Sequence, residues 1–301
     1  MKIGIVGLGS IGKRVYLPLY LENKEIRKIH VYGRKPEKLK ADLEKYNLEI
    51  EHDFDQMLDK IDCLMVHSAT KSHYELVYKA LEKRIPVYVD KPLTDDIAQS
   101  NTLISLAKEN NTLLFVGYNR RYAPLYLELQ EMDLKPVKLY YEKHRSGVSQ
   151  KESYEDAIID DFIHLIDTVM DLNTNELQLR QVVLGKTKKN ELTSLHVDLS
   201  SDTQINTLFT TRGSGNDYEK ITIHAKDQII EITDMRVLKV MKDNKTSYRK
   251  INERLSDSQI RGFENTLNTF FEQSNKNKYR ENRAIDSEQI CLDIINILNK
   301  K

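Results

Sequence analysis

The residues best suited to acid–base chemistry lie on one predicted helix, residues 158–172. Its sequence, IIDDFIHLIDTVMDL, places Asp160, His164, Asp167 and Asp171 three or four residues apart. This spacing puts the four side chains on one narrow face, and the apolar remainder predicts a buried helix. A carboxylate one turn from His164 raises the basicity of the imidazole, which suits a general base. Two other roles stay open: a hydrogen-bonded core histidine, or chelation of a divalent metal by Asp160, His164 and Asp167. No second cluster of His or Cys offers further ligands, so we predict no metal site.

A second group suited to chemistry is Lys91, within the tripeptide Asp90-Lys91-Pro92 that follows a predicted strand at residues 86–89. Ligands of open α/β sheets bind at the carboxyl ends of the strands, so an ammonium there can reach a substrate oxygen. Proline also makes a cis Lys91–Pro92 bond accessible. The alternative is that Lys91 is a surface lysine and that Pro92 starts a helix.

A glycine-rich turn, GLGSIG at residues 7–12, follows an apolar strand and precedes a predicted helix at residues 13–21. In this context G-x-G-x-x-G predicts dinucleotide binding. Gly7 permits the tight turn, Gly9 lets the backbone approach a pyrophosphate, and Gly12 lets helix and strand pack closely. The helix N-terminus, with Ser10 and Ile11, offers free N–H groups to the phosphates.

The end of the second predicted strand, residues 28–32, favours NADP over NAD. Many such folds place an acid here to bind the adenosine ribose, whereas this chain has Gly33, Arg34 and Lys35. Gly33 leaves space, and the two cations suit a 2′-phosphate. In the alternative, Arg34 lies over the adenine and either cofactor binds.

Further contacts are predicted from two short segments. The small residues of Ser68-Ala69-Thr70 suit a loop below the nicotinamide ribose, and His73 opens the next helix, where a structural task is also open. The predicted cofactor contacts are Gly7, Gly9, Ser10, Ile11, Gly12, Gly33, Arg34, Lys35, Ser68, Ala69, Thr70, His73, Asp90 and Lys91. The predicted substrate contacts are Tyr118, Asn119, Arg120, Arg121, Asp160 and His164, although the two arginines also suit inter-domain ion pairs.

Two domains are predicted from the order of elements. Residues 1–118 alternate strands with helices, which is typical of a doubly wound parallel sheet, a Rossmann domain that binds NAD(P). From residue 137, consecutive strands up to 237–241 predict a mostly antiparallel open sheet, followed by helices at 258–273 and 285–298. We expect residues 119–301 to form an α+β domain for substrate binding and oligomerisation, with the C-terminal helix able to pack back on the first domain.

Composition excludes several classes of partner. The 301 residues carry 46 basic and 46 acidic side chains, so neither nucleic acid nor an anionic membrane is indicated. Only two cysteines occur, and the chain enters its first strand without room for a signal peptide, so we expect a cytoplasmic protein. No apolar run is long enough to cross a bilayer.

These motifs together resemble the Gfo/Idh/MocA oxidoreductases over essentially the full chain. The resemblance rests on GLGSIG, SATKSH at 68–73, DKP at 90–92, GYNRRYAP at 117–124 and D-x-x-x-H-x-x-D at 160–167. It implies that Lys91 contacts substrate and cofactor, although the family has Glu-Lys-Pro, and that Asp160 and His164 contact substrate. The family often has glycines where this chain has YEDA at 154–157, which leaves the substrate undefined. Family members commonly oligomerise through the second sheet, so we expect a homodimer.

The resemblance and the residues lead to one mechanistic hypothesis. Hydride passes between the nicotinamide and a secondary alcohol or ketone of a sugar, polyol or similar small hydroxy compound, with Lys91 and His164 converging on the reacting oxygen. His164 acts as general base, Asp160 orients the substrate, and Lys91 stabilises developing negative charge. Two alternatives are a nucleotide-dependent sensor or partner-binding protein without turnover, and redox-assisted elimination or hydrolysis of a glycoside.

Overall fold

The computed structural model describes residues 1–33, 36–43, 46, 48–132, 134–147, 153–173, 175–279 and 284–300. The chain forms two compact units, neither of which is one continuous stretch. The first unit consists of Met1–Tyr118 and Phe263–Ile285, and the second of Asn119–Gly262 and Asp286–Lys301. The assignment of cofactor binding to the first unit and of substrate binding to the second stays a prediction.

The first unit is built on a six-stranded parallel sheet in the order β3-β2-β1-β4-β5-β6. Its strands are β1 (Lys2–Val6), β2 (Lys28–Tyr32), β3 (Glu49–Glu51), β4 (Cys63–Val66), β5 (Val87–Val89) and β6 (Leu114–Val116). The inner strands β4 and β5 are apolar and buried along their length, as a covered parallel sheet requires. This order confirms the doubly wound Rossmann fold.

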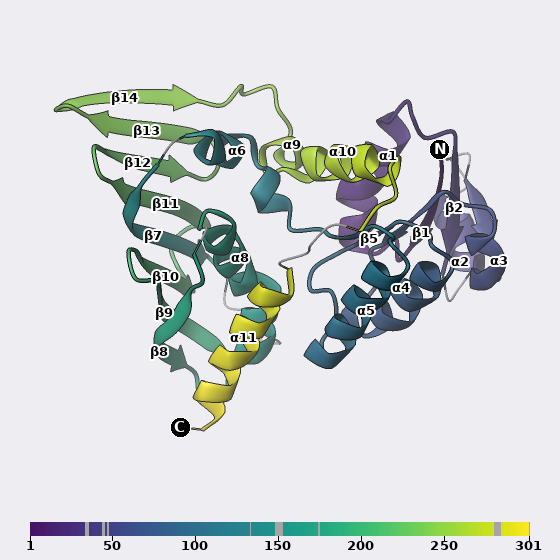
Figure 1. Cartoon of the computed structure of the whole chain (residues 1–301), viewed down its shortest axis with the longest axis horizontal. Coiled ribbons are helices and arrows are strands. Elements are labelled where there is room, and N and C mark those ends of the chain that lie inside the picture. The colour runs from purple at the N-terminus through teal and green to yellow at the C-terminus, as the bar shows by residue number, and fades with distance from the viewer. Residues whose placement is uncertain are drawn as a thin grey trace. The chain divides into compact units, whose positions relative to one another are not determined.

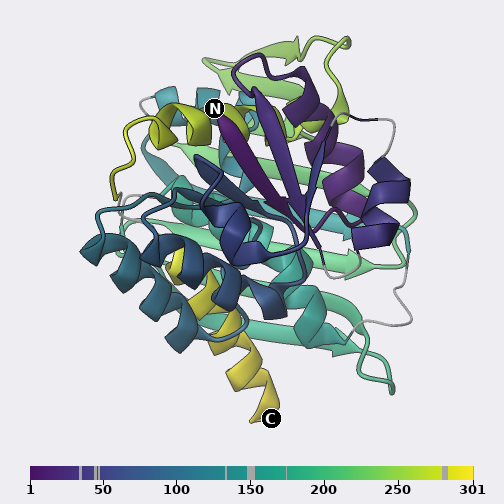
Figure 2. The same ribbon diagram turned by 90° about the vertical axis from the view of Figure 1, so that its right-hand side faces the viewer.

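Helices flank this sheet. A π-helical turn (Gly12–Tyr16) leads into α1 (Leu17–Glu22), and α2 (Pro36–Leu43), α3 (Phe54–Leu58), α4 (His73–Glu82) and α5 (Ile97–Glu109) follow. Figure 2 shows α4 and α5 side by side. A later helix, α10 (Phe263–Ser274), also belongs to this unit, and its Phe263 and Phe270 pack edge-on against Tyr16 and Tyr88.

The second unit is built on an eight-stranded sheet in the order β14-β13-β12-β11-β7-β10-β9-β8. Its strands are β7 (Pro136–Arg145), β8 (Gln178–Lys186), β9 (Leu192–Ser200), β10 (Ile205–Arg212), β11 (Tyr218–Ala225), β12 (Gln228–Thr233), β13 (Val237–Lys242) and β14 (Lys245–Lys250). All neighbours are antiparallel except β7 and β10. The mostly antiparallel sheet is therefore confirmed, and β14 is a strand that the sequence prediction missed.

One face of this sheet is covered by helices (Figure 1). The chain runs through α6 (Pro124–Glu131), then α7 (Tyr154–Ala157), a π-helical turn (Ile158–Phe162) and α8 (Ile163–Asp171), with α11 (Ala284–Asn299) beside α8. The Ser287 hydroxyl of α11 donates to Asp167 of α8, 3.2 Å away. The predicted single helix at 258–273 is wrong: α9 (Asp257–Ile260) ends before Gly262, whose φ of +83° interrupts the helix ahead of α10.

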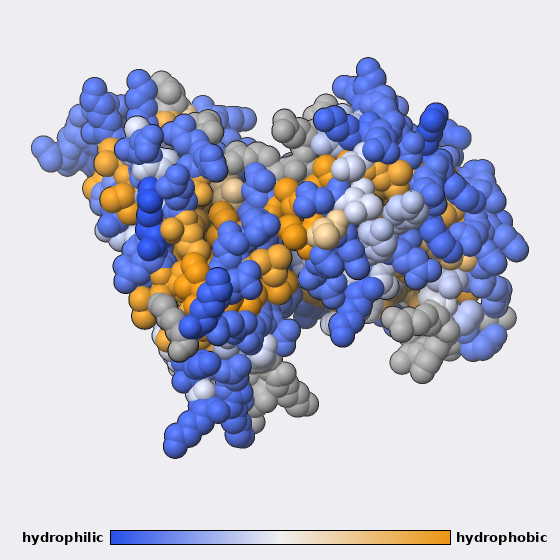
Figure 3. Space-filling view, turned by 60° about the horizontal axis from the view of Figure 1, so that its bottom comes forward, coloured by the Kyte–Doolittle hydropathy of each residue, from blue (hydrophilic) through white to orange (hydrophobic). Residues whose placement is uncertain are grey.

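The surface is mixed in character. Hydrophilic residues cover most of the face in Figure 3, and apolar residues gather in limited areas. The exposed large apolar side chains include Val183, Ile205 and Tyr248 of the second sheet. Within the part of the chain that the structure describes, no helix combines the length and apolarity needed to span a membrane.

Candidate functional site

The glycine-rich turn has the geometry of a phosphate cradle. Gly7 has a φ of +91°, and a Cβ on it would lie 2.3 Å from the Ser68 nitrogen. A Cβ on Gly12 would lie 2.9 Å from the Gly7 oxygen. Gly9 differs, because a Cβ on it would meet no atom within 4 Å. The fold therefore requires glycine at Gly7 and Gly12, whereas Gly9 faces open space where a ligand can approach the backbone.

A cavity of about 620 Å³ lies along this turn, a volume suited to a cofactor. It is lined by the ends of β1, β2 and β4 and by α4, at residues Val6, Gly7, Gly9, Tyr32, Gly33, Phe54, His67, Ser68, Ala69, Lys71, Ser72, Glu75, Leu76 and Lys79. Five of the predicted cofactor contacts are thus brought together: Gly7, Gly9, Gly33, Ser68 and Ala69. Ser10 and Ile11 lie exposed at the start of the helix, and Thr70 opens a 3₁₀ turn. Arg34 and Lys35 lie outside the described residues.

The loop that carries Lys91 is held by His73. The Lys91–Pro92 bond is cis, which confirms the form considered from the sequence. His73 is 1% exposed, and its Nδ1 lies 3.0 Å from the Pro92 oxygen while its Nε2 lies 3.0 Å from the Ser68 oxygen. The imidazole therefore bridges the Lys91 loop and the loop after β4, whose Ser68 lines the cavity.

Asp90 is held by a buried network that the sequence prediction missed. The Tyr16 hydroxyl donates to one Asp90 oxygen at 2.6 Å, and Nδ1 of His67 lies 3.0 Å from the other. Nε2 of His67 lies 2.7 Å from the Tyr20 hydroxyl. Burial alone would raise the pKa of Asp90, but His67 and Tyr16 outweigh it and hold that pKa below its usual value. An ionised Asp90 thus anchors the backbone next to Lys91.

The predicted acid–histidine helix is interrupted by the π-helical turn, which changes the faces that its residues occupy. Asp160 is exposed, whereas Asp161 reaches toward the sheet. His164 is 8% exposed, and its carbonyl accepts a hydrogen bond from the Thr168 hydroxyl at 2.8 Å. The π-helical turn therefore shifts Asp160 from the position that regular helical spacing predicts, whereas Asp167 and Asp171 both lie beside Arg121.

Asp167 forms an ion pair with Arg121. Its carboxylate accepts from Nε and Nη2 of Arg121 at 2.9 and 2.5 Å, and from the Ser287 hydroxyl. Among the described residues, no three His, Cys, Asp or Glu side chains are grouped to hold a metal ion. Chelation by Asp160, His164 and Asp167, the alternative that their spacing left open, is therefore not the arrangement of these residues.

Two of the other predicted substrate residues also make internal contacts. Asn119 donates to the Arg261 oxygen at 2.7 Å. Arg120 is 1% exposed and donates to both Glu219 oxygens, at 2.7 and 2.9 Å. Tyr118, the last residue of its segment of the first unit, is 1% exposed.

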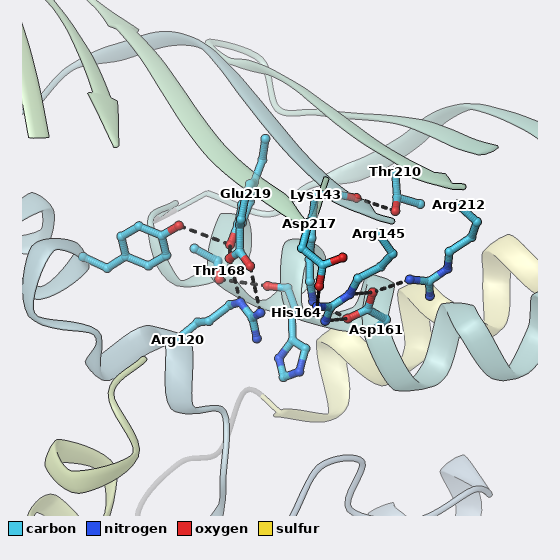
Figure 4. A network of polar contacts seen from close by, with 12 residues as sticks. Arg120, Lys143, Arg145, Asp161, His164, Thr168, Thr210, Arg212, Asp217 and Glu219 are labelled. Carbon is cyan, nitrogen blue, oxygen red and sulfur yellow. Dashed lines mark hydrogen bonds and ion pairs between the residues drawn. The ribbon is translucent and has the colours of Figure 1, made fainter. Parts of the chain in front are cut away.

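Arg120 belongs to a polar cluster between the second sheet and its helices (Figure 4). Glu219 also accepts from the Tyr141 hydroxyl at 2.5 Å. Burial raises the pKa of Glu219, but Arg120 outweighs burial and lowers it to about 2. The Glu219 carboxylate is therefore ionised at neutral pH.

Asp161 is the second acid of this cluster. It accepts from Lys143, from Arg145 at 2.9 Å and from Arg212 at 2.9 Å. Burial raises the pKa of Asp161, and the neighbouring cations, Lys143 first, hold it well below its usual range. Burial and the Arg120 charge lower the pKa of Lys143 to about 7. No local sequence pattern predicts this cluster, because its members lie on β7, β10 and β11, on the π-helical turn and on a 3₁₀ turn (Asn119–Tyr122).

Comparisons with known proteins agree with this architecture. Residues 1–118 match a family described as "Oxidoreductase family, NAD-binding Rossmann fold", and residues 124–243 match "YceM-like, C-terminal domain". Among curated proteins, the chain is 28% identical over 236 residues to YceM of Salmonella typhimurium, described as an oxidoreductase. That match covers 78% of this chain and 77% of the relative.

Two further relatives extend the comparison. A myo-inositol 2-dehydrogenase of Thermotoga maritima is 30% identical over 138 residues, which is 44% of this chain and 40% of that protein. The crystal structure of a dehydrogenase, MviM, from Clostridium difficile superposes with a TM-score of 0.93 at 26% identity. It covers 98% of this chain and 99% of that one.

Proposed function

Because the chain belongs to the Gfo/Idh/MocA family of NAD(P)-dependent oxidoreductases, we propose that it oxidises a secondary alcohol, or reduces the matching ketone, on a sugar, polyol or similar small hydroxy compound. The observation that carries this proposal is the glycine cradle, where Gly9 opens onto a cavity that residues of three strand ends line. The bound nicotinamide supplies or accepts the hydride.

The cofactor fits the cradle through backbone groups. Gly9 and the N–H groups of Ser10 and Ile11 would hold the pyrophosphate, because these residues open the first helix. Ser68 and Ala69 line the same cavity farther along the sheet edge. We propose NADP as the preferred form, since Gly33 stands where an acid would bind the ribose and Arg34 and Lys35 follow it.

Three side chains are proposed to act on the substrate. His164 takes the hydroxyl proton as the alcohol is oxidised and returns it in the reverse reaction. Lys91 donates to the reacting oxygen and stabilises its developing negative charge. Asp160, exposed one turn before His164, orients the substrate. Tyr118, Asn119, Arg120 and Arg121 stay predicted as further substrate contacts.

Two wider expectations also stay predictions. A homodimer is expected, and the outer face of the second sheet is its proposed contact. A cytoplasmic location is expected because both cysteines are buried thiols, which suits a reducing compartment.

The proposal is tested in two steps with purified protein. The first step is a fluorescence titration with NADPH and with NADH, in which we expect binding of both and tighter binding of NADPH. The second step measures cofactor reduction over a panel of sugars and polyols. Tight cofactor binding without any turnover across the panel would favour a sensor, and turnover of a glycoside without net cofactor reduction would favour redox-assisted cleavage.

The NADP preference has its own control. Replacing both Arg34 and Lys35 by Gln should weaken NADPH binding about tenfold or more and leave NADH binding nearly unchanged, because only NADPH carries the 2′-phosphate. Equal losses for both cofactors would contradict the assignment of these residues to the phosphate.

A further inference from the structure

A second cavity, of about 180 Å³, opens beside the polar cluster of the second unit. Its basic lining residues are Arg120, Lys143, Arg145, Arg236 and Arg261, and we call it the basic cavity. Complete small-molecule sites usually measure about 300–1,000 Å³. The basic cavity is therefore large enough for one substituent of a ligand and too small for a whole cofactor or nucleotide.

Buried positive charge around the basic cavity exceeds buried negative charge. Arg120, Lys143 and Arg212 are nearly buried and Arg145 is partly buried, whereas among the described residues the acids buried with them are Glu219 and Asp161. Asp161 alone is shared by three of these cations.

The remaining acids that line the basic cavity, Asp217, Asp234 and Asp257, are exposed. Water screens their charge, so they compensate the buried cations weakly. A buried cation without a nearby anion destabilises the folded protein, and an anionic ligand in the basic cavity would relieve this destabilisation.

The basic side chains respond to this imbalance. Burial first, and then the nearby Arg120 charge, lower the pKa values of both Lys143 and Arg261, that of Lys143 to about 7. Glu219 outweighs burial at Arg120 and Asp161 does so at Arg145, so the pKa values of these two arginines are raised. The poorly compensated cations are therefore Lys143 and Arg261, and a bound anion would offset the Arg120 charge at both.

Arg120 also retains hydrogen-bonding capacity. Its Nε and Nη2 atoms donate to Glu219, while Nη1 is buried and has no hydrogen-bond partner among the described residues. Figure 4 shows this third nitrogen turned away from Glu219. The Nη1 atom of Arg120 can therefore donate a hydrogen bond to a carboxylate or phosphate oxygen.

The chain keeps this cluster next to the proposed base. Asp161, three residues before His164, binds Lys143 and Arg145, and Asp167, three residues after it, binds Arg121, the neighbour of Arg120. Contacts on both sides of His164 therefore fix it beside the basic residues, within one unit (Figure 4).

We propose that the basic cavity is a substrate subsite that receives an anionic substituent, a carboxylate or a phosphate, of the hydroxy compound. The inference rests on the proposed function, because it adds a charged group to the same substrate. Acidic sugars or sugar phosphates are then the substrate class, and neutral polyols are poor substrates.

The test measures anion binding directly, by isothermal titration calorimetry of the full chain with inorganic phosphate, glucuronate, glucose 6-phosphate and glucose. We expect glucose to bind at least about tenfold more weakly than one of the two anionic sugars, since a charge-assisted hydrogen bond is lost. Preference for glucuronate or for glucose 6-phosphate identifies the anionic group as carboxylate or phosphate.

Variants locate the binding. Arg261→Gln should weaken binding of the preferred anion about tenfold or more, and Arg120→Gln should do the same if it folds, as checked by circular dichroism. The control is Arg180→Gln on β8, an exposed arginine that donates to Ser200. Equal affinity of the wild-type protein and Arg261→Gln for every anion overturns the proposal, and so does equal affinity of the wild-type protein for glucose and both anionic sugars.

A parallel NADPH titration separates this inference from the proposed function. Anion binding that requires Arg261 in a protein that binds no cofactor would support the basic cavity and refute the proposed oxidoreductase activity. Cofactor binding with turnover of neutral polyols, unchanged in Arg261→Gln, would support the activity and refute the subsite.

Discussion

At the scale of single residues, the two proposed reacting groups are supported by contacts that the sequence reveals only in part. Local patterns identified both residues: Lys91 lies in a tripeptide that follows a predicted strand, and His164 lies one helical turn after Asp160. They did not identify Tyr16 and His67, which contact Asp90 only because β1, β4 and β5 are neighbours in the sheet, or Tyr20, which contacts His67. Such long-range contacts depend on topology and leave no periodic signal.

Removing either reacting group should lower turnover and spare cofactor binding. His164→Ala should reduce kcat by about 10²–10⁴-fold, the usual contribution of a positioned general base. Lys91→Ala should lower kcat as well, and neither change should alter the NADPH dissociation constant more than a few-fold. The measurement is steady-state kinetics on a confirmed substrate, with Lys189→Ala, an exposed turn residue, as the control. Near-normal turnover in both variants would refute these roles.

Glu219 should make stability depend on pH in acid. Its pKa is about 2 in the folded protein and about 4.5 when unfolded, so its stabilising contribution is complete above pH 4.5. As pH falls from 4.5 toward 2, the unfolded chain binds the proton first and about 3 kcal/mol is lost.

Urea unfolding of wild-type protein and Glu219→Gln at a series of pH values measures this contribution. The variant should be less stable at pH 7, and the difference should shrink below pH 4.5. Asp202→Asn, in an exposed turn, should leave the pH profile unchanged. A constant difference between wild type and Glu219→Gln would show that Glu219 is not the titrating group.

At the scale of elements, the pattern of apolar residues predicted most strands and helices. It failed for a strand that is fully exposed and for a helix whose residues per turn change. β14, KTSYRK, is exposed along its whole length and pairs only with β13, so it carries no apolar alternation. The π-helical turn at residues 158–162 places Asp161, instead of Asp160, among the buried cations. A uniform 3.6-residue period cannot anticipate that extra residue.

The first βα turn gives a matched pair of glycine substitutions. Gly7→Ala should destabilise the protein by about 2 kcal/mol or more, because its φ is positive and a Cβ would clash with the Ser68 backbone. Gly9→Ala should leave the melting temperature almost unchanged, since a Cβ meets no protein atom, yet weaken NADPH binding by occupying the space beside the backbone. Thermal melts and NADPH titrations measure both effects. Loss of stability in Gly9→Ala with intact NADPH affinity would contradict the cradle assignment.

At the scale of the whole molecule, the first unit is completed by a segment from far along the chain. Phe263 and Phe270 of α10 contact Tyr16 and Tyr88, and Asn277 accepts from the Leu113 nitrogen at 3.2 Å. The predicted boundary after residue 118 did not include this segment, because an amphipathic helix does not reveal which sheet it covers.

A polypeptide of residues 1–118 alone should therefore not fold cooperatively, since Tyr16 and Tyr88 would lose their apolar cover. The same residues joined to residues 263–279 by a short Gly-Ser linker should show a cooperative thermal transition. A short linker suffices because Asn119 and Gly262, the residues next to the two ends, lie against each other. Circular dichroism melts of both polypeptides decide this point, and cooperative unfolding of residues 1–118 alone would show that α10 is dispensable.

The position of His73 has a consequence for the order of events in turnover. One imidazole spans the carbonyl of Ser68, beside the cofactor cavity, and the carbonyl of Pro92, next to Lys91. We therefore propose that a nucleotide seated against the first loop also sets the position of the second. The coenzyme would then place the Lys91 ammonium before the alcohol or ketone arrives.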